Sequence, residues 1–164
     1  MSDAETEVEI LVIGIGNPLR GDDAIGWFAA QTLAERVDSD RVTTMALHQL
    51  TPEWAKAMSR MKMVIFIDAA EGQAAGTISI KEIYPSDSPP SMTHLLSPQG
   101  LLALSARLYH STPRTYLCTV GGGDFGHKEE LSAPVEAACA VLVQRVDEMI
   151  QSVLELEEQL HAHA

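Results

Sequence analysis

Two adjacent acids, Asp22 and Asp23, lie at the end of a glycine-rich turn in the segment GIGNPLRGDDAIG, residues 14–26. The apolar run EILVI precedes this segment, and a helical pattern follows it. A turn between a first strand and a first helix is where open parallel sheets bind their ligands, at the carboxyl ends of the strands. The two carboxylates are therefore candidate ligands for a metal ion. The alternative is that Asp22 caps the helix and Asp23 supplies a favourable charge to its first turn.

The same turn does not fit a phosphate or a nucleotide. The dinucleotide fingerprint requires a third glycine where this chain has Leu19, and an acid closing the second strand where residues 46–48 read Ala-Leu-His. The sequence contains neither GKS nor GKT, and carboxylates at the start of a helix repel a phosphate. A nucleotide-binding regulatory domain is therefore a disfavoured alternative.

Asp68 and His94 are the other candidate ligands. Asp68 terminates the predicted strand MVIFID, so its carboxylate is expected to face the same crevice as the glycine-rich turn. His94 lies between a proline-rich turn and a predicted helix, on a loop that can present its imidazole. An acid after the first strand, an acid after the third and a histidine on a later loop match a divalent-metal site. The alternatives are a cap or turn residue for Asp68 and an ordinary loop residue for His94.

Several other residues have both a structural and a functional interpretation. His48, at the end of the second predicted strand, is predicted to be structural, with lining of the cleft as the alternative. His110 follows a predicted helix, where the helix dipole favours it as a C-terminal cap. His127 borders the loop GGGDFG, which we expect to shape a peptide-binding cleft. Gly121–Gly123 in this loop would allow an extended substrate strand to approach closely.

Apolar, β-branched runs alternate with helical patterns along nearly the whole chain. Continuous apolar runs such as ILVIGI and MVIFI indicate strands buried on both faces of a sheet. We therefore predict a three-layer α/β protein: a doubly wound, mostly parallel twisted sheet with helices on both faces and one antiparallel strand. The run TISIKEI alternates apolar and polar residues, which indicates an edge strand or a strand with one exposed face. The predicted strands are 9–15, 42–47, 63–69, 77–83 and 115–122, and the predicted helices are 23–37, 51–60, 97–109 and 132–160.

Three of the predicted helices begin with N-cap chemistry. Thr51, Ser97 and Ser132 each precede a proline by one or two residues, which is typical of an N-cap followed by the first helical turn. The hydroxyl of such a residue accepts a hydrogen bond from a free N–H group of that turn. Each of the three is therefore predicted to begin a helix.

The composition fits one folded domain spanning residues 1–164, with flexible tails predicted at 1–7 and at about 158–164. The 23 acidic and 11 basic residues give a net charge of −12, which repels nucleic-acid backbones. No apolar run reaches the roughly 18 residues that a membrane-spanning helix needs. The N-terminus lacks the basic region of a secretory signal, and Cys118 and Cys139 form no CxxC pair. We therefore expect a cytoplasmic protein with two buried thiols.

Five motifs together resemble those of the hydrogenase maturation protease family, and they span most of the chain: GIGNPLRGDDAIG, HQLTPEWAKAM, FIDAA, THLLSP and GGGDFG. The first is the most specific, because its acid pair stands at a set spacing from the glycines. The resemblance implies a phosphorylase/hydrolase-like α/β fold and an endopeptidase activity. Members of this family remove a short C-terminal extension from the large subunit of nickel-iron hydrogenase, and they recognise the nickel that has already been inserted.

The resemblance also implies roles for individual residues. Asp23, Asp68 and His94 match the family's metal ligands and are the implied catalytic residues, with Asp22 as a supporting or helix-capping residue. The metal is the nickel of the substrate, with other divalent ions as substitutes in vitro, and three protein ligands leave coordination positions open for it. The metal would position the scissile peptide and polarise its carbonyl or activate a water molecule. The implied partner is a nickel-loaded large-subunit precursor, bound transiently by a monomer.

One position departs from the family pattern. Relatives can have an acid near the end of the second strand, where this chain has His48 and Gln49. The sequence also lacks the DTG or DSG motif of aspartic proteases, so metal-assisted hydrolysis is preferred over two acids sharing a proton. Two alternatives remain open. One is a non-catalytic chaperone that senses nickel through the same ligands, and the other is a peptidyl-tRNA hydrolase, which the net charge of −12 disfavours.

Overall fold

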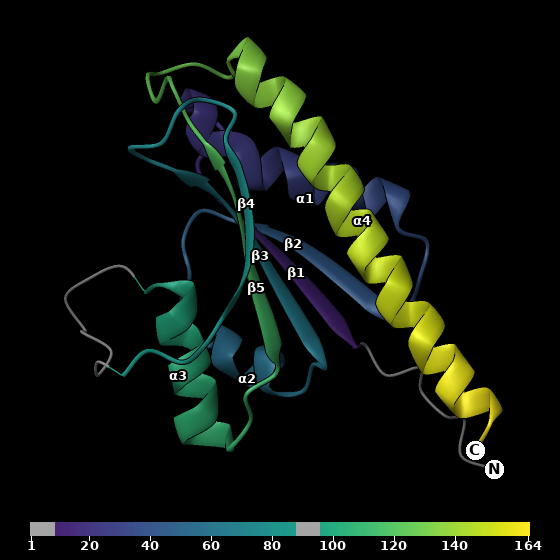
Figure 1. Ribbon diagram of the computed structural model, residues 1–164. Helices are drawn as coiled ribbons and strands as arrows, with labels where there is room; N and C mark the ends of the chain where they lie inside the picture. Colours follow the sequence, from purple (N-terminus) through teal and green to yellow (C-terminus); the bar gives the residue numbers. More distant parts are fainter. Residues whose placement is uncertain (1–8, 88–95) are drawn as a thin grey trace.

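The computed structural model describes residues 9–87 and 96–164, and its centre is a sheet of five strands (Figure 1). The strands lie in the order β2-β1-β3-β5-β4. β2, β1, β3 and β5 run parallel, and β4 pairs with β5 in the antiparallel direction. The strands are β1 Ile10–Ile15, β2 Val42–Leu47, β3 Met63–Ala70, β4 Ile78–Ile83 and β5 Arg114–Gly121.

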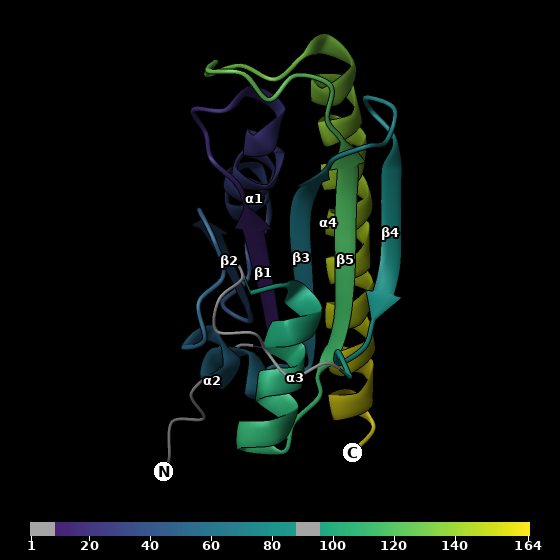
Figure 2. The ribbon, with the colours of Figure 1, turned by 90° about the vertical axis from the view of Figure 1, so that its left-hand side faces the viewer.

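Helices cover both faces of the sheet. Helices α1 and α4 pack on one face, and α2 and α3 pack on the other, which is the face turned toward the viewer in Figure 2. A short 3-10 turn, η1, leads into α1. The bounds are η1 Gly21–Ala24, α1 Ile25–Arg36, α2 Trp54–Ser59, α3 Pro98–Tyr109 and α4 Ala133–Ala162. The predicted three-layer, doubly wound α/β fold with one antiparallel strand is therefore confirmed.

The two-sided burial of the central strands follows from their sequences. Successive side chains of a strand point to opposite faces, so an unbroken apolar run fills two cores at once. In β1, Ile10 and Val12 pack in the core beneath α1 and α4, while Leu11 and Ile13 pack in the core beneath α2 and α3. Full burial of one such side chain contributes about 1.5–3 kcal/mol to folding.

β4 differs from the central strands because it lies at the edge of the sheet. Ile78 and Ile80 pack against the core beneath α1 and α4, while Lys81 on the opposite face is exposed, which matches the alternation at the start of TISIKEI. The expected edge strand is therefore confirmed, and it is the antiparallel strand of the sheet.

The helix ends test the predicted caps. The Ser97 hydroxyl accepts a hydrogen bond from the Gly100 N–H at 3.0 Å, and α3 begins at the next residue. Ser132 stands at the N-cap position of α4, as predicted, but its hydroxyl donates to Asp22 and makes no capping hydrogen bond. His110 is the C-cap of α3 in the left-handed conformation, with φ of 53°, which confirms its predicted place. The prediction for Thr51 is wrong: α2 begins at Trp54, because the preceding residues form a tight turn in which the Trp54 N–H donates to the Thr51 carbonyl at 3.2 Å.

The last helix continues to Ala162 and extends past the end of the sheet (Figure 1). The flexibility expected from about residue 158 onward stays a prediction, and the predicted tail at 1–7 lies outside the described residues. None of the helices in the described ranges is long and apolar enough to cross a membrane.

Candidate functional site

Asp23 and Asp68 come from neighbouring strands of the sheet. Asp23 lies in η1, shortly after β1, and Asp68 lies near the carboxyl end of β3, which pairs with β1. The chain leaves β1 toward β2 on one side and returns to β3 on the other, so the order of strands reverses between them. Ligands of open α/β sheets bind at this reversal. β3 runs on to Ala70, so Asp68 stands two residues before the strand ends rather than at its last position.

Glycines bring η1 and the start of α1 down onto the strand ends. A Cβ atom at Gly26 would lie 2.3 Å from the carbonyl oxygens of both Ile15 and Ile67. A Cβ atom at Gly14 would lie 1.9 Å from the Gly26 carbonyl oxygen. No side chain fits in either place, because real Cβ contacts are longer than 3.0 Å. The spacing of glycines in the first motif therefore sets how closely Asp23 approaches β3.

Asp68 is the most perturbed acid of this site. Its carboxylate is mostly buried, and its Oδ1 accepts a hydrogen bond from the Ala69 N–H at 2.8 Å. Burial, with the negative charges of Asp23 and Glu71, raises the pKa of Asp68 from 3.8 to about 7. The charge of Asp23 therefore acts on Asp68. A carboxyl group that titrates near neutral pH beside a second acid is a feature of functional sites.

Asp23 itself is held by the turn that precedes it. Its Oδ2 accepts a hydrogen bond from the Asn17 N–H at 3.0 Å. The Asn17 side chain in turn accepts a hydrogen bond from the Leu19 N–H at 2.9 Å. These contacts order the GNPL turn around the carboxylate. Asn17 is thus a positioning residue that the sequence indicated only as part of a turn.

Asp22 is fully buried and makes four hydrogen bonds to one distant loop. Its carboxylate accepts from the backbone N–H groups of Gly123 and Asp124 at 2.8 Å, and from the Ser132 N–H at 2.7 Å and hydroxyl at 2.8 Å. Burial opposes its ionisation, but these hydrogen bonds outweigh burial and lower the pKa of Asp22. The helix-cap interpretation of Asp22 is wrong, since its partners are 101 to 110 positions away. Asp22 ties the site loop to the segment before α4.

The glycine loop before α4 is filled by the chain itself. A Cβ atom at Gly121 would lie 2.3 Å from the Ala74 carbonyl oxygen, and one at Gly122 would lie 2.4 Å from the Phe125 ring. Both glycines are buried. The expected approach of a substrate strand is therefore wrong for Gly121 and Gly122, because the chain's own backbone and an aromatic ring occupy that space.

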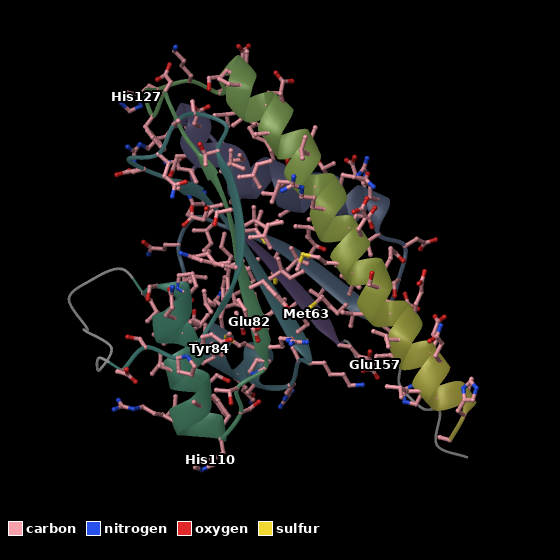
Figure 3. All side chains as sticks on the ribbon, in the orientation of Figure 1. Met63, Glu82, Tyr84, His110, His127 and Glu157 are labelled. Atoms are coloured by element: carbon pink, nitrogen blue, oxygen red, sulfur yellow. The ribbon has the colours of Figure 1, made fainter. Side chains whose placement is uncertain are left out.

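The histidines fall in different places. His48 is exposed just after β2, and its ring packs edge-on against Trp27, with ring centroids 5.1 Å apart. His127 and His110 lie at opposite ends of the molecule (Figure 3). His94 lies outside the described residues. Within residues 9–87 and 96–164 no three histidine, cysteine, aspartate or glutamate side chains gather into a metal-binding group, so the ligand set of Asp23, Asp68 and His94 stays a prediction.

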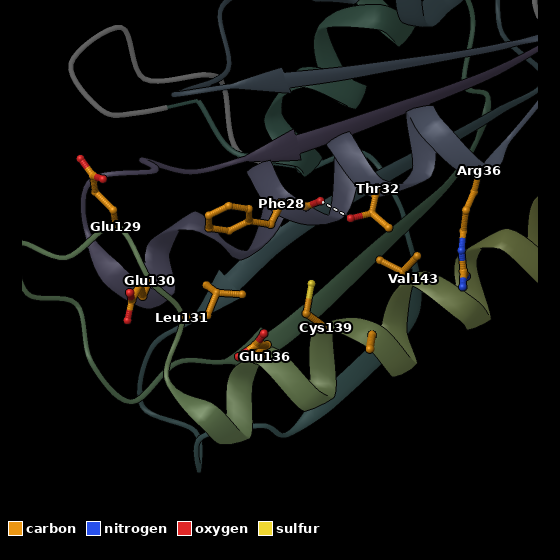
Figure 4. A pocket seen from close by; sticks show the side chains of 10 residues that line it. Phe28, Thr32, Arg36, Glu129, Glu130, Leu131, Glu136, Cys139 and Val143 are labelled. Atoms are coloured by element: carbon orange, nitrogen blue, oxygen red, sulfur yellow. Dashed lines mark hydrogen bonds between the residues drawn. The ribbon is translucent and has the colours of Figure 1, made fainter.

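A cavity of about 640 Å³ lies away from these acids, between α1 and α4 (Figure 4). Phe28 of α1 and Cys139 of α4 line its floor. Burial, with the nearby charge of Glu136, raises the pKa of the Cys139 thiol to about 11, and burial raises the pKa of Cys118 to about 12. Both thiols are free, buried and protonated at neutral pH, as the sequence predicted, so they are poor nucleophiles. The thiol of Cys139 therefore gives this cavity no ready nucleophile.

Comparison with solved structures shows which proteins this chain resembles. No protein-family model and no curated sequence matches the chain. The hydrogenase maturating endopeptidase HybD from E. coli is 25% identical, with 88% of this chain and 93% of that chain covered and a TM-score of 0.68. The maturation protease HycI from Thermococcus kodakarensis KOD1 is also 25% identical, with 90% and 95% covered and a TM-score of 0.69. An endopeptidase from Escherichia coli has 25% identity, 84% and 89% coverage and a TM-score of 0.66. The chain is therefore similar, over most of its length, to hydrogenase maturation proteases of known structure.

The protein is therefore an enzyme of the peptidase class, and the predicted resemblance is confirmed. The similarity covers nearly the whole of the solved relatives. Sequence reasoning missed the anchoring role of Asp22. Its local sequence carried no signal for that role, because all its partners belong to a loop more than 100 positions later.

Proposed function

We propose that this peptidase removes the C-terminal extension of a nickel-iron hydrogenase large subunit after nickel insertion, and that it recognises the nickel bound in that substrate. Its partner would be the nickel-loaded precursor, bound by a monomer in the cytoplasm. The observation that supports this most is the acid pair, Asp23 and Asp68, at the reversal of strand order between β1 and β3. The names of the solved relatives support the same substrate class.

The donor types suit the proposed substrate. Nickel accepts mixed carboxylate and imidazole ligands, and Asp23, Asp68 and His94 would provide two oxygens and one nitrogen. A site with three protein ligands leaves positions for ligands from the substrate. In the free protein Asp68 is half protonated near pH 7, and a cation that arrives with the substrate displaces this proton, because metal binding requires the ionised carboxylate.

The bound nickel would position the scissile peptide and polarise its carbonyl or activate a water molecule. Asn17 would hold Asp23 in place through the 3.0 Å hydrogen bond to its Oδ2. Asp22 would keep the site loop attached to the segment before α4. These two residues would position the site without touching the metal.

The decisive experiment mixes the protein with a nickel-loaded large-subunit precursor and measures the mass of the product. Wild type is expected to yield a C-terminally shortened subunit. Asp68→Asn, Asp23→Asn and His94→Ala are each expected to slow shortening by about 100-fold, because each removes one ligand. Glu71→Gln is the matched control: it removes an exposed charge that also acts on Asp68, and it should keep at least half of the wild-type rate.

The outcomes separate the candidate functions. Stable binding of the loaded precursor without shortening would favour a nickel-sensing chaperone over a protease. Shortening at the wild-type rate by Asp68→Asn would remove Asp68 from the site. Thermal unfolding of each variant shows whether a loss of rate reflects chemistry or loss of fold.

A further inference from the structure

β2 is an edge strand whose own sequence has neither a charged residue nor a proline to hinder pairing. Edge strands are normally shielded by charged side chains, proline or bulges, because their free N–H and C=O groups can pair with another chain. β2 reads VTTMAL, without a charge or a proline, and in the described part of the chain it pairs with β1 alone. The opposite edge, β4, includes Lys81 and Glu82. The two edges of this sheet therefore differ in how readily they can pair with an added strand.

The backbone of β2 presents its outer hydrogen-bonding groups at alternate residues. The carbonyls of Arg41 and Leu47 point toward β1, since they accept hydrogen bonds from the N–H groups of Ile10 at 3.1 Å and Gly16 at 2.9 Å. In a strand the N–H and C=O of one residue point to the same side, and successive residues alternate. Even-numbered residues of β2 therefore point their backbone groups away from β1.

Two N–H groups remain for a partner on this outer side. The Val42 N–H already donates to the Ser39 carbonyl at 3.2 Å. Thr44 and Ala46 then offer both an N–H and a C=O to the outside, and both residues are only half-buried. Such a row of donors and acceptors matches the backbone of an extended peptide.

The carboxyl end of β2 lies beside the loop that carries Asp23. The Leu47 carbonyl accepts the Gly16 N–H, and Gly16 is in close contact with the Asp23 backbone: a Cβ atom there would lie 1.9 Å from the Asp23 carbonyl oxygen. The Trp27–His48 ring contact stands at the same end. A peptide that followed the outer edge of β2 would thus leave it next to the loop that carries Asp23.

We propose that the outer edge of β2 binds an extended segment of the protein substrate as an added strand and directs it toward Asp23 and Asp68. This inference rests on the proposed protease function. The acids that flank β2 are Asp38 and Asp40 before it and Glu53 after it, and all three are exposed. They favour a segment with basic residues at its ends, and they repel acidic peptides and nucleic acids. Backbone pairing supplies affinity, and the charges supply selectivity.

Proline substitutions test the edge without disturbing the β1–β2 pairing. Thr44→Pro and Ala46→Pro each remove an outward N–H, and proline is tolerated on an edge strand when the lost N–H faces outward. Either variant is expected to raise KM for the nickel-loaded precursor by about tenfold and to leave kcat within about twofold, since ground-state binding is lost while the acids stay in place. Wild-type KM and kcat in both variants would overturn the proposal.

Glu82→Pro is the matched control on the other edge. The Thr77 carbonyl accepts the Gly121 N–H of β5 at 2.8 Å, so alternation places the Glu82 N–H on the outer side of β4. This variant is expected to keep KM within about twofold of wild type. An equal rise in KM for Glu82→Pro would show a general effect of proline on the sheet and would overturn the assignment to β2.

A second measurement needs no variant to fold. Pulsed hydrogen exchange of wild type, with precursor in excess, is expected to slow the Thr44 and Ala46 amides by at least about fivefold, because pairing protects them. Unchanged exchange at both amides would overturn the proposal. Absence of any shortening by wild type would overturn the protease function instead, and the exchange measurement would still decide whether β2 accepts a strand.

Discussion

Asp22 and Asp68 show how their surroundings shift the pKa values of two identical groups in opposite directions. Asp22 is fully buried, yet four hydrogen bonds keep it ionised. Asp68 is mostly buried with a single backbone hydrogen bond and acidic neighbours, and its pKa rises to about 7. Burial raises a carboxyl pKa unless donors compensate, so the number of donors separates the two cases. The buried acid with many donors is structural, and the one with few is the candidate for chemistry.

The raised pKa of Asp68 predicts that the metal-free protein loses stability as the pH rises from about 4 to about 7. The folded state holds a proton on Asp68 up to about pH 7, whereas the unfolded chain releases it near 3.8. The folded state thus binds more protons in this window, so the free energy of unfolding falls with pH, by at most about 4 kcal/mol. Urea unfolding between pH 5 and 8, with chelator present, measures this.

Asp68→Asn provides the comparison for that measurement. The amide does not ionise, so this variant should be more stable than wild type at pH 8 and similar to it at pH 5. Shortening of the precursor should follow the opposite course in wild type and decline below pH 7, because ionised Asp68 is needed as a ligand. Parallel pH profiles of stability for the two proteins would show that Asp68 has an ordinary pKa.

At the scale of elements, the first helix is placed by glycines rather than by large side chains. Gly26 of α1 sits against the carbonyls of Ile15 in β1 and Ile67 in β3, and Gly14 of β1 sits against Gly26. The contact brings the amino end of α1 onto the two strands whose ends carry the acids. The same glycines that looked like a ligand-binding turn in the sequence therefore serve close packing between helix and sheet.

Gly26→Ala is expected to destabilise the protein by about 3 kcal/mol or more, because its methyl group would lie 2.3 Å from two carbonyl oxygens and α1 would have to move. The shift would also move Asp23 away from Asp68, so processing of the precursor should fall more than stability alone explains. Gly72→Ala is the control. Gly72 has φ of 76° but no atom within 4 Å of a Cβ, so only backbone strain of about 1 kcal/mol is expected there. Urea unfolding of both variants measures the difference.

At the scale of the whole molecule, ionic contacts join the amino ends of the strands to the end of α4. Glu9, with 8% of its surface exposed, pairs with Arg41 just before β2 and with Lys62 just before β3. Lys62 also contacts Glu157 of α4 at 2.7 Å. Burial opposes the ionisation of Glu9, but these cations outweigh it and lower its pKa. The network lies at the amino ends of the strands, whereas Asp23 and Asp68 lie toward their carboxyl ends.

Arg41→Ala is expected to cost about 2–3 kcal/mol of stability at pH 7, because it leaves the buried carboxylate of Glu9 without its main partner. The loss should vanish at a pH low enough to protonate Glu9, and the rate of precursor processing should stay unchanged. Arg114→Ala is the control: its pair with Glu82 is exposed, so no measurable change in stability is expected. A loss as large for Arg114 as for Arg41 would contradict the special role of the buried pair.

Local patterns predicted much of this protein. The apolar period of each segment indicated the order of strands and helices, the edge position of residues 77–83 and the caps at Ser97 and His110. The predictions were wrong where contacts that the local motif does not encode changed the local structure. Thr51 had the residue type of a cap, but a tight turn preceded the helix. Gly121 and Gly122 had the form of an open loop, but Ala74 and Phe125 fill the space beside them.

The sequence by itself determined the layers of the fold, because alternation and apolar runs act between neighbours along the chain, and its motifs indicated the family. Only the tertiary structure decided what the acids do. Asp22 meets its donors 101 to 110 positions away, and Asp68 acquires its pKa of about 7 from burial and from Asp23, 45 positions earlier in the chain. The desolvation and hydrogen bonding of a carboxylate depend on which distant groups fold around it. A local sequence pattern therefore does not predict its pKa.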